Sequence, residues 1–187
     1  MSNFQYIQIE DKDILSGYIK DGGLHELYNL CFNAPPYNEY FEINEIRRIF
    51  GKYCTDGILY LCLDGKKVIG FIAAFPLKLE EKVYQIVKNH LVDVDKYWYH
   101  ADIGTHPDPE YRRKGIAKTL WNAILNKVPT SHFVARTQEG NEASKSLHLK
   151  LGFQILAHVD GTFVTQDVHR DDRHEPDKRI FLYYERD

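Results

Sequence analysis

The sequence predicts one α/β domain built on a twisted, mainly antiparallel mixed sheet with one parallel pair of strands at its centre. The first observation behind this prediction is a hairpin signal. Asp64-Gly65 lies between two runs rich in Ile, Leu, Val and Phe, at Gly57–Leu63 and Lys67–Phe75. An Asp-Gly pair between two apolar runs is typical of a tight turn, so these runs are expected to form antiparallel strands.

The second observation is a strand–helix–strand pattern in the next part of the chain. Trp98–Thr105 and His132–Thr137 are apolar runs of strand length, and Gly115–Lys127 between them carries two apolar stripes at helical spacing. A helical connection of this kind makes a right-handed crossover between two parallel strands. Ligands bind at the carboxyl ends of such strands, so a functional site is expected there.

Apolar spacing predicts further elements near the start of the chain. Leu24–Phe32 and Glu42–Phe50 have apolar residues three and four apart, as in a helix. The first of these helices runs into two prolines, and the Gly51-Lys52 pair is expected to end the second. Asn3–Glu10 is expected to form a short strand, and Asp11–Gly23 to contain a short helix.

The end of the chain is expected to add two strands, at Gln154–Val159 and Arg179–Glu185. Between them, Asp160–Lys178 is polar and rich in both charges, and it is too long for a simple hairpin turn. Such a segment is typical of a solvated loop, while a lid over a substrate is the alternative.

Composition excludes several classes of protein. The 187 residues suffice for one domain with a real core. The formal net charge of −3 argues against general nucleic-acid binding, which favours a basic surplus. No apolar run reaches membrane-spanning length, and Met1–Glu10 lacks the features of a signal peptide. The three cysteines have no metal-like spacing, so we expect reduced thiols in a cytoplasmic protein.

A basic loop precedes the helix of the strand–helix–strand unit. Its residues Arg112, Arg113, Lys114 and Gly115 stand where a helix N-terminus offers free N–H groups and a favourable dipole to an anion. The loop lacks the Gly-Lys-Ser/Thr ending of a P-loop and the three glycines of a Rossmann fingerprint. It therefore indicates a phosphate site of another kind, the alternative being a solvated basic turn.

These residues resemble those of a known family, the GCN5-related N-acetyltransferases (GNAT family). Arg112, Gly115 and Ala117 fill the places of its pyrophosphate loop, Arg/Gln-x-x-Gly-x-Gly/Ala. The family's next motif, an Asn followed by roughly Leu-Tyr-x-x-Leu-Gly-Phe, is matched at Asn141, Leu147, Leu151, Gly152 and Phe153. One departure matters, because His148 stands where the family usually has tyrosine. The turn before the loop also carries about two extra residues compared with the family's usual pattern.

The resemblance implies an acetyl-CoA-dependent N-acetyltransferase with a splayed parallel strand pair and no metal. It divides a single domain, residues 1–187, into an acceptor-side half (1–96), an acetyl-CoA-binding core (97–153) and a C-terminal part (154–187). Asn141 has a second available role, as a helix N-cap. The acetyl-CoA contacts implied are the main chain of Ile103 and Thr105, the loop residues Arg112, Arg113, Lys114, Gly115, Ile116 and Ala117, and Asn141 and Ser144.

Two residues are candidates for the chemistry of acyl transfer. Asp102 lies near the end of the strand and is the candidate acceptor of the amine's proton; alternatively it bonds a nearby backbone N–H. His148 is the candidate proton donor to the departing thiolate. Its place near a helix C-terminus favours the cation, and the alternative is a surface histidine. His100 and His106 near Asp102 invite a metal reading, but the sequence shows no convergent ligands.

The acceptor is expected to be a small-molecule or peptide amine bound near residues 28–50. Tyr28, Phe32, Tyr37, Tyr40 and Phe41 lie there with Glu39, Glu42 and Glu45. Aromatic rings with carboxylates suit a cationic amine, although the same residues also suit a core and a solvated helix face. The sequence leaves open a homodimer, and a rival function as a non-catalytic acyl-CoA-binding sensor or interaction module.

Overall fold

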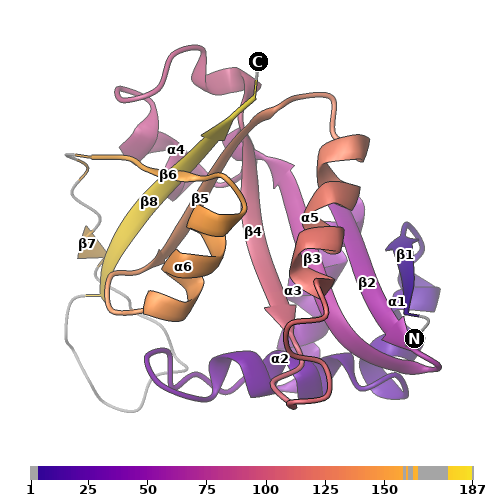
Figure 1. Ribbon diagram of the computed structural model, residues 1–187. Helices are drawn as coiled ribbons and strands as arrows, with labels where there is room; N and C mark the ends of the chain where they lie inside the picture. Colours follow the sequence, from indigo (N-terminus) through magenta and orange to yellow (C-terminus); the bar gives the residue numbers. More distant parts are fainter. Residues whose placement is uncertain (1–3, 158, 160–161, 164–176, 187) are drawn as a thin grey trace. The chain divides into compact units, whose positions relative to one another are not determined.

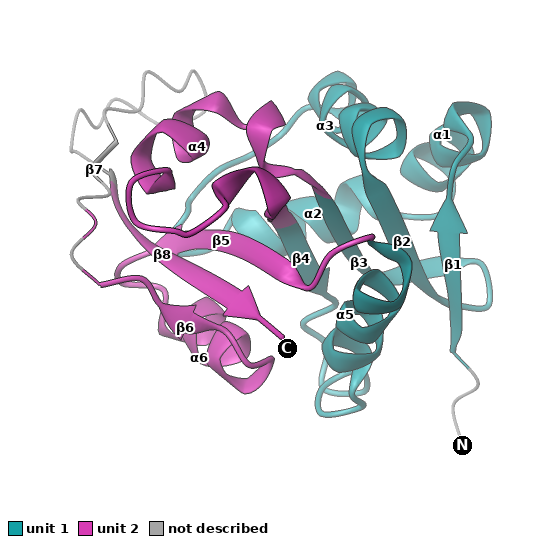
Figure 2. Cartoon of the chain, turned by 90° about the horizontal axis from the view of Figure 1, so that it is seen from above, with its two compact units in different colours: residues 1–74, 102–128 teal, residues 75–101, 129–187 magenta. Residues whose placement is uncertain are grey.

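The computed structural model describes residues 4–157, 159, 162–163 and 177–186, and it has the predicted α/β class (Figure 1). The chain divides into two compact units (Figure 2). Unit 1 comprises residues 1–74 and 102–128, and unit 2 comprises residues 75–101 and 129–187. Within the described ranges, no helix has the length and apolar character needed to cross a membrane.

Unit 1 begins with antiparallel strands. Its elements are β1 (Gln5–Ile9), α1 (Lys12–Lys20), α2 (Leu24–Phe32), α3 (Ile43–Asp56), β2 (Ile58–Asp64), most of β3 (Lys67–Pro76), the end of β4 (Trp98–Thr105) and α5 (Ile116–Lys127). β1 pairs with β2, and β2 with β3. Asp64 pairs with Lys67, so the predicted hairpin turns at Gly65-Lys66, with Gly65 at φ 59°. The hairpin prediction is confirmed.

The helix that follows the basic loop packs directly on the strands of unit 1. A Cβ atom added at Gly70 of β3 would lie 2.9 Å from Ile116 and 3.3 Å from Leu120, both on α5. Because glycine has no side chain, α5 can approach the sheet this closely. Ile116 and Leu120 are buried at this contact, which fixes the first turns of the helix and hence its N-terminus.

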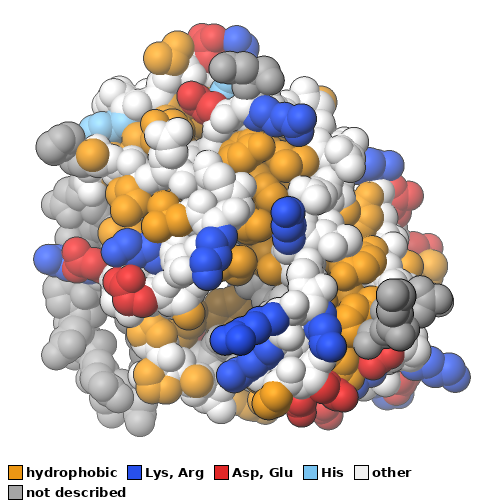
Figure 3. Space-filling model, in the orientation of Figure 1, with side chains coloured by type: hydrophobic (Ala, Val, Ile, Leu, Met, Phe, Trp, Pro, Cys, Tyr) orange, Lys and Arg blue, Asp and Glu red, His pale blue; other side chains and the backbone are white. Residues whose placement is uncertain are grey.

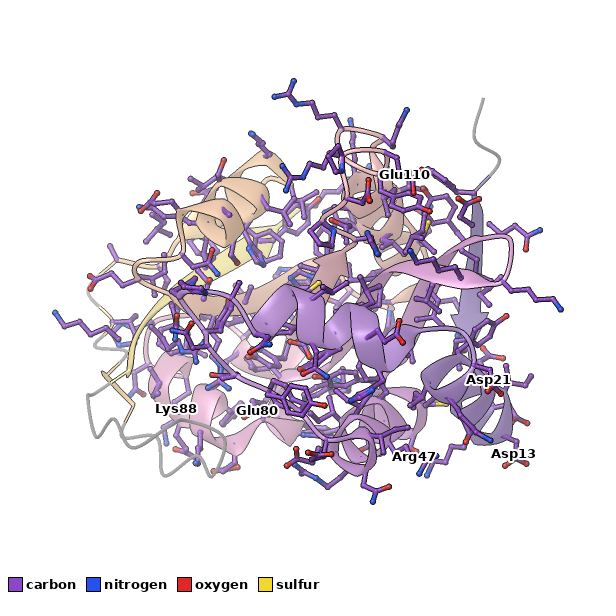
Figure 4. The ribbon with its side chains drawn as sticks, turned by 90° about the horizontal axis from the view of Figure 1, so that it is seen from below. Asp13, Asp21, Arg47, Glu80, Lys88 and Glu110 are labelled. Carbon is purple, nitrogen blue, oxygen red and sulfur yellow. The ribbon has the colours of Figure 1, made fainter. Side chains whose placement is uncertain are left out.

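Side-chain caps begin two of the helices of unit 1. Asp11 accepts hydrogen bonds from the backbone N–H groups of Asp13 and Ile14 at the start of α1. Figure 4 labels Asp13 in the first turn of this helix and Asp21 at its end. Glu42 and Glu45 form a capping box at the start of α3. These caps explain why the helices begin where they do.

Unit 2 contains the parallel strand pair. Its elements are η1 (Leu77–Leu79), α4 (Glu81–Val87), η2 (Val94–Lys96), the start of β4, β5 (His132–Gln138), α6 (Glu142–Lys150), β6 (Gln154–Ile155), β7 (Thr162–Phe163) and β8 (Asp177–Glu185). β4 pairs with β5 in parallel from Trp98 to His100, opposite Phe133 to Ala135. The two strands are therefore paired over only three residues each, as expected for strands that splay apart. β8 pairs antiparallel with β5, β6 and β7.

Several predicted boundaries were wrong. The helix expected to end at Phe50 runs on to Asp56, because Gly51 is tolerated inside it and the apolar face continues to Tyr53. The strand expected at 154–159 covers only Gln154–Ile155. Both residues are exposed at the edge of the sheet, so burial of apolar side chains does little to stabilise a longer strand there. β5 ends one residue later and β8 begins two residues earlier than expected. Of the charged segment 160–178, most lies outside the described residues.

Candidate active site

In unit 1, Asp102 is held by two tyrosine hydroxyls. Its Oδ2 atom accepts a hydrogen bond from Tyr53 of α3 at 2.5 Å and one from Tyr28 of α2 at 3.2 Å. The carboxyl group is half-buried, whereas both tyrosines are buried. Burial, followed by the charge of Asp102, holds the pKa of Tyr28 well above its usual value, so this hydroxyl keeps its proton and donates. Two helices thus orient one carboxylate.

Sequence reasoning missed Tyr53, because the helix was expected to end before it. A signal was available, since Ile46, Phe50 and Tyr53 have the 4, 3 spacing of one helical face and all three are buried. The ring of Tyr53 packs edge-on against Phe50, with 5.5 Å between ring centres. Packing of this face carries the helix past Gly51 and brings the Tyr53 hydroxyl to Asp102.

An aromatic cluster surrounds Tyr28. Its ring centre lies 4.5 Å from that of Phe32, 5.0 Å from Phe41, 5.4 Å from Phe50 and 5.6 Å from Phe71. Phe50 and Phe71 are core residues, but Phe32 and Phe41 are only half-buried. The charge of Glu39, also half-buried, is one of the smaller causes that raise the pKa of Tyr28. The predicted aromatic and acidic residues are thus partly brought together.

Asn29 attaches the connection between α2 and α3 to this cluster. Its side-chain Nδ2 donates to the carbonyl of Phe41 at 3.0 Å, and the N–H of Phe41 donates back to its Oδ1 at 2.8 Å. His25 also contacts the Phe41 carbonyl, at 2.9 Å. These contacts fix the ring of Phe41 beside Tyr28. No pattern in the sequence pointed to Asn29.

The charge of Asp102 also acts on Cys31, and Cys31 stays a protonated thiol. Burial, followed by the charge of Asp102, raises the pKa of Cys31 to about 12. Its Sγ atom lies 3.8 Å from the carbonyl oxygen of Thr105 and donates to it. The thiolate is the nucleophilic form, so Cys31 is not an activated nucleophile at neutral pH.

The backbone of the basic loop contains left-handed residues just before α5. Arg113 has φ 58° and Gly115 has φ 77°, and Gly115 is the N-cap of α5. Left-handed residues alternating with right-handed ones turn successive N–H groups to one side. The side chains of Arg112, Arg113 and Lys114 are exposed. Figure 3 shows Lys and Arg side chains gathered where Figure 1 draws the loop that leads into α5.

The turn before this loop is tied to the β2–β3 hairpin. The hydroxyl of Tyr111 donates to Asp64 at 3.2 Å, and Lys67 lies over the Tyr111 ring, 5.6 Å from its centre. The guanidinium of Arg112 donates to the carbonyl of Pro107 at 2.7 Å. His106 accepts from the backbone N–H of Asp108. The long turn thus has a defined path, and it places the loop at the N-terminus of α5.

In unit 2, Asn141 caps α6. Its Oδ1 atom accepts from the backbone N–H of Ser144 at 2.9 Å, and the side chain is buried. This confirms the predicted N-cap. Ser144 is half-buried in the first turn of the helix, one turn before His148.

His148 is neither the surface residue nor the cation that the sequence indicated. Its side chain is 4% exposed, and burial lowers its pKa below the usual value. The Nδ1 atom lies 2.8 Å from the carbonyl oxygen of Ser144, and Nε2 lies 3.1 Å from Nδ1 of His100. The surface position and the cationic form are both wrong for the same reason: the ring turns inward and packs against His100 and Phe153.

His100 is the residue of unit 2 that sequence reasoning did not connect with His148. It is 2% exposed, and burial followed by the neighbouring His148 holds its pKa well below the usual value. Forty-eight positions separate the two histidines, and no local pattern joins them. Among the described residues, no group of three or more His, Cys, Asp or Glu side chains could hold a metal ion.

Acidification is expected to destabilise the protein through these two histidines. Both are neutral in the fold with lowered pKa values, whereas in the unfolded chain they take up protons below about pH 6.5. The unfolded state then binds more protons, so the free energy of unfolding falls as pH falls, by up to about 1.4 kcal/mol per pH unit for each histidine. Urea unfolding at pH 7.5 and 5.5 measures this loss. The double variant His100→Asn/His148→Tyr should lose clearly less than the wild type, and an equal loss would contradict the prediction.

Comparisons with known proteins show the family and the fold of this chain. Residues 23–153 match the model of the Acetyltransferase (GNAT) family. A diaminobutyrate acetyltransferase of Paenibacillus lautus, solved with its substrate and coenzyme A, is similar at a TM-score of 0.59 and 15% identity, covering 98% of this chain and 96% of that one.

Two further solved structures are similar over nearly their whole length. A GNAT family acetyltransferase of Elizabethkingia anophelis with acetyl-CoA bound gives a TM-score of 0.60 at 15% identity, with 99% of each chain covered. Arabidopsis thaliana NAA60, in complex with a bisubstrate analogue, gives 0.60 at 16% identity, with 97% of each chain covered. A search of curated protein sequences finds no significant match.

Proposed function

Because the chain belongs to the Acetyltransferase (GNAT) family, we propose that it transfers the acetyl group of acetyl-CoA to an amine by direct attack in a ternary complex. In this reaction the amine nitrogen forms a bond to the acetyl carbon, and the carbon–sulfur bond breaks. An amine that arrives protonated loses two protons, one before the attack and one after it; the sulfur of coenzyme A gains one and the other is released to solvent. Holding both substrates together supplies much of the rate, so no covalent intermediate is needed.

The basic loop of unit 1 is proposed to bind the pyrophosphate of acetyl-CoA. Its left-handed residues Arg113 and Gly115, the N-terminus of α5 and three exposed cationic side chains all favour an anion there. Ile116 and Ala117 continue the loop into the helix, and the main chain of Ile103 and Thr105 is proposed to bond the pantetheine arm. This loop is the observation that best supports the proposal.

Asp102 is proposed to accept the proton of the attacking amine, directly or through water. Tyr53 and Tyr28 donate to one of its oxygens, which holds the carboxylate in one orientation. An oriented base contributes about 10²–10⁴-fold to a reaction of this kind.

In unit 2, Asn141, Ser144 and His148 are proposed to serve the acetyl-CoA side of the reaction. Asn141 and Ser144 are proposed contacts of the pantetheine arm. His148 occupies the place of the family's tyrosine, and we propose that it serves the leaving sulfur; its neutral ring has one N–H, on Nδ1, which must release the Ser144 carbonyl in order to donate there. A neutral imidazole N–H can stabilise developing negative charge without giving up its proton.

The acceptor is proposed to be a cationic amine of a small molecule or a peptide. Phe32 and Phe41 are half-buried beside Tyr28, and the carboxylates of Glu39 and Asp102 both act on its hydroxyl. Aromatic faces and carboxylates together favour an amine that arrives protonated.

The test is acetyl-CoA consumption with a panel of amines, followed by free thiol. We expect turnover, and we expect it to be faster with diamines than with amines whose tail carries a carboxylate. If no amine is acetylated while acetyl-CoA still binds, the alternative of a non-catalytic acyl-CoA sensor would hold instead. If amines are acetylated at rates that do not depend on their charge, the proposed acceptor class would be contradicted, but the proposed acetyl transfer would not.

A further inference from the structure

The turn between β4 and α5, in which Figure 4 labels Glu110, is held by hydrogen bonds of its own backbone. Pro107 and Pro109 fix two of its φ angles. Every other backbone N–H from His106 to Arg112 donates a hydrogen bond. The acceptors of these N–H groups are, in chain order, the carbonyl of Ile69, Nδ1 of His106, Oδ1 of Asp108, the carbonyl of Asp108 and the carbonyl of Pro109. The turn is therefore a closed, internally bonded unit that leads directly into the basic loop.

Tyr111 connects this turn to the β2–β3 hairpin. Its side chain is buried, although the residues that follow it in the basic loop are exposed. The hydroxyl donates to Asp64 at 3.2 Å, and Lys67 lies over the ring, 5.6 Å from its centre. The ring of His106 packs edge-on against the same ring, with 5.2 Å between the two centres. Burial, followed by hydrogen bonds with Glu110 and Asp64, raises the pKa of Tyr111 to about 12, so the hydroxyl keeps its proton and remains a donor.

We propose that Tyr111 is a positioning residue for acetyl-CoA: anchored on the β2–β3 hairpin, it holds the basic loop in the conformation that binds the pyrophosphate. This rests on the part of the proposed function in which that loop is the pyrophosphate site. Only Arg112 separates Tyr111 from Arg113, whose φ of 58° is uncommon for a residue other than glycine. Such a backbone conformation persists only where its surroundings hold it. The loop is held on both sides, by buried Tyr111 before it and by buried Ile116 after it, so it meets acetyl-CoA already in place.

Two substitutions remove the bond between Tyr111 and the hairpin from opposite ends. Tyr111→Phe deletes the hydroxyl and leaves the ring between Lys67 and His106. Affinity falls with the fraction of chains in which the loop is held, and one hydrogen bond biases a local equilibrium by up to about tenfold, so the Kd of acetyl-CoA should rise by up to about tenfold. Asp64→Ala deletes the acceptor, leaves Gly65 to make the hairpin turn, and should have a similar effect. The double variant should bind no more weakly than Tyr111→Phe alone, because both substitutions remove the same bond.

Two controls separate positioning of the loop from a general loss of structure. The first is a second ligand, S-acetylpantetheine, which carries the acetyl thioester and the pantetheine arm but no pyrophosphate. Its affinity should be unchanged in Tyr111→Phe. The second is the matched variant Tyr60→Phe, in which the lost hydroxyl bonds Gln8 between β2 and β1 of the same unit. This variant should bind acetyl-CoA as the wild type does.

The measurement is the Kd of each ligand for the full chain, by titration calorimetry with acetyl-CoA and by NMR titration with S-acetylpantetheine. Weaker binding of acetyl-CoA alone in Tyr111→Phe supports the inference. An unchanged Kd would overturn it, as would an equal loss for S-acetylpantetheine, a similar loss in Tyr60→Phe or a further loss in the double variant. If Tyr111→Phe does not fold, Asp64→Ala with the same two ligands decides. Failure to acetylate any amine would contradict the proposed acetyl transfer but would leave these binding constants, and so the inference, intact.

Discussion

Gly115→Glu should abolish the thermal stabilisation that acetyl-CoA gives to the wild-type chain. Gly115 is the N-cap of α5 at φ 77°, and nothing lies within 4 Å of a Cβ added there. A glutamate would therefore project a carboxylate into the space proposed for the pyrophosphate. At about a hundredfold excess over Kd, ligand binding stabilises a fold by near 3 kcal/mol, or about 6–12 °C for a chain of this size. Differential scanning fluorimetry with and without acetyl-CoA measures the shift.

Two control variants separate the charge from its consequences for the backbone. Gly17→Glu places the same side chain on exposed α1, where nothing lies within 4 Å of the new Cβ, and should keep the full shift. Gly115→Asn introduces no charge and tolerates the left-handed backbone. It should keep a larger part of the shift than Gly115→Glu. A full shift in Gly115→Glu would remove the loop from the proposed site.

Features set by neighbouring residues could be predicted from the sequence. The β2–β3 hairpin follows from Asp64-Gly65, and the cap of α6 follows from Asn141. The basic loop precedes α5 as expected, with Gly115 as its N-cap. In each case the decisive interaction lies within a few residues of the chain. Turn conformation and capping depend on residue type at fixed offsets, which a sequence displays directly.

Features set by distant pairs could not be predicted. Tyr53 reaches Asp102 across 49 positions and His100 reaches His148 across 48. No hydrophobic period encodes such a meeting, because it depends on which faces of a sheet and helix come together. The contacts of Tyr53 and His100 therefore appear only in the folded chain.

The charge of His148 shows how local reasoning gives the wrong sign. A helix C-terminus favours a cation by about 0.3–1 kcal/mol, which is less than one pKa unit. Full burial can lower the pKa of a base by up to 3–5 units. The helix position was visible in the sequence and the burial was not, so the smaller effect decided the expectation. In the folded protein burial is the larger effect, and the pKa is lowered.

Asp102→Asn should lower turnover at neutral pH by about 10²–10⁴-fold while leaving acetyl-CoA affinity unchanged. An amide is isosteric with the carboxylate but cannot take the amine's proton. The loss should shrink as pH rises, because free amine then accumulates and needs no base.

Tyr53→Phe is the matched variant for Asp102→Asn. It removes the hydroxyl that donates to Asp102 at 2.5 Å and leaves the ring packed on Phe50. The carboxylate remains but is less well oriented, so turnover should fall by less than in Asp102→Asn, with the same pH dependence as the wild type. Steady-state rates from pH 6 to 9 with one good acceptor distinguish these outcomes. A wild-type profile in Asp102→Asn would show that the amine releases its proton elsewhere, and that Tyr28 and Tyr53 hold Asp102 for structural reasons only.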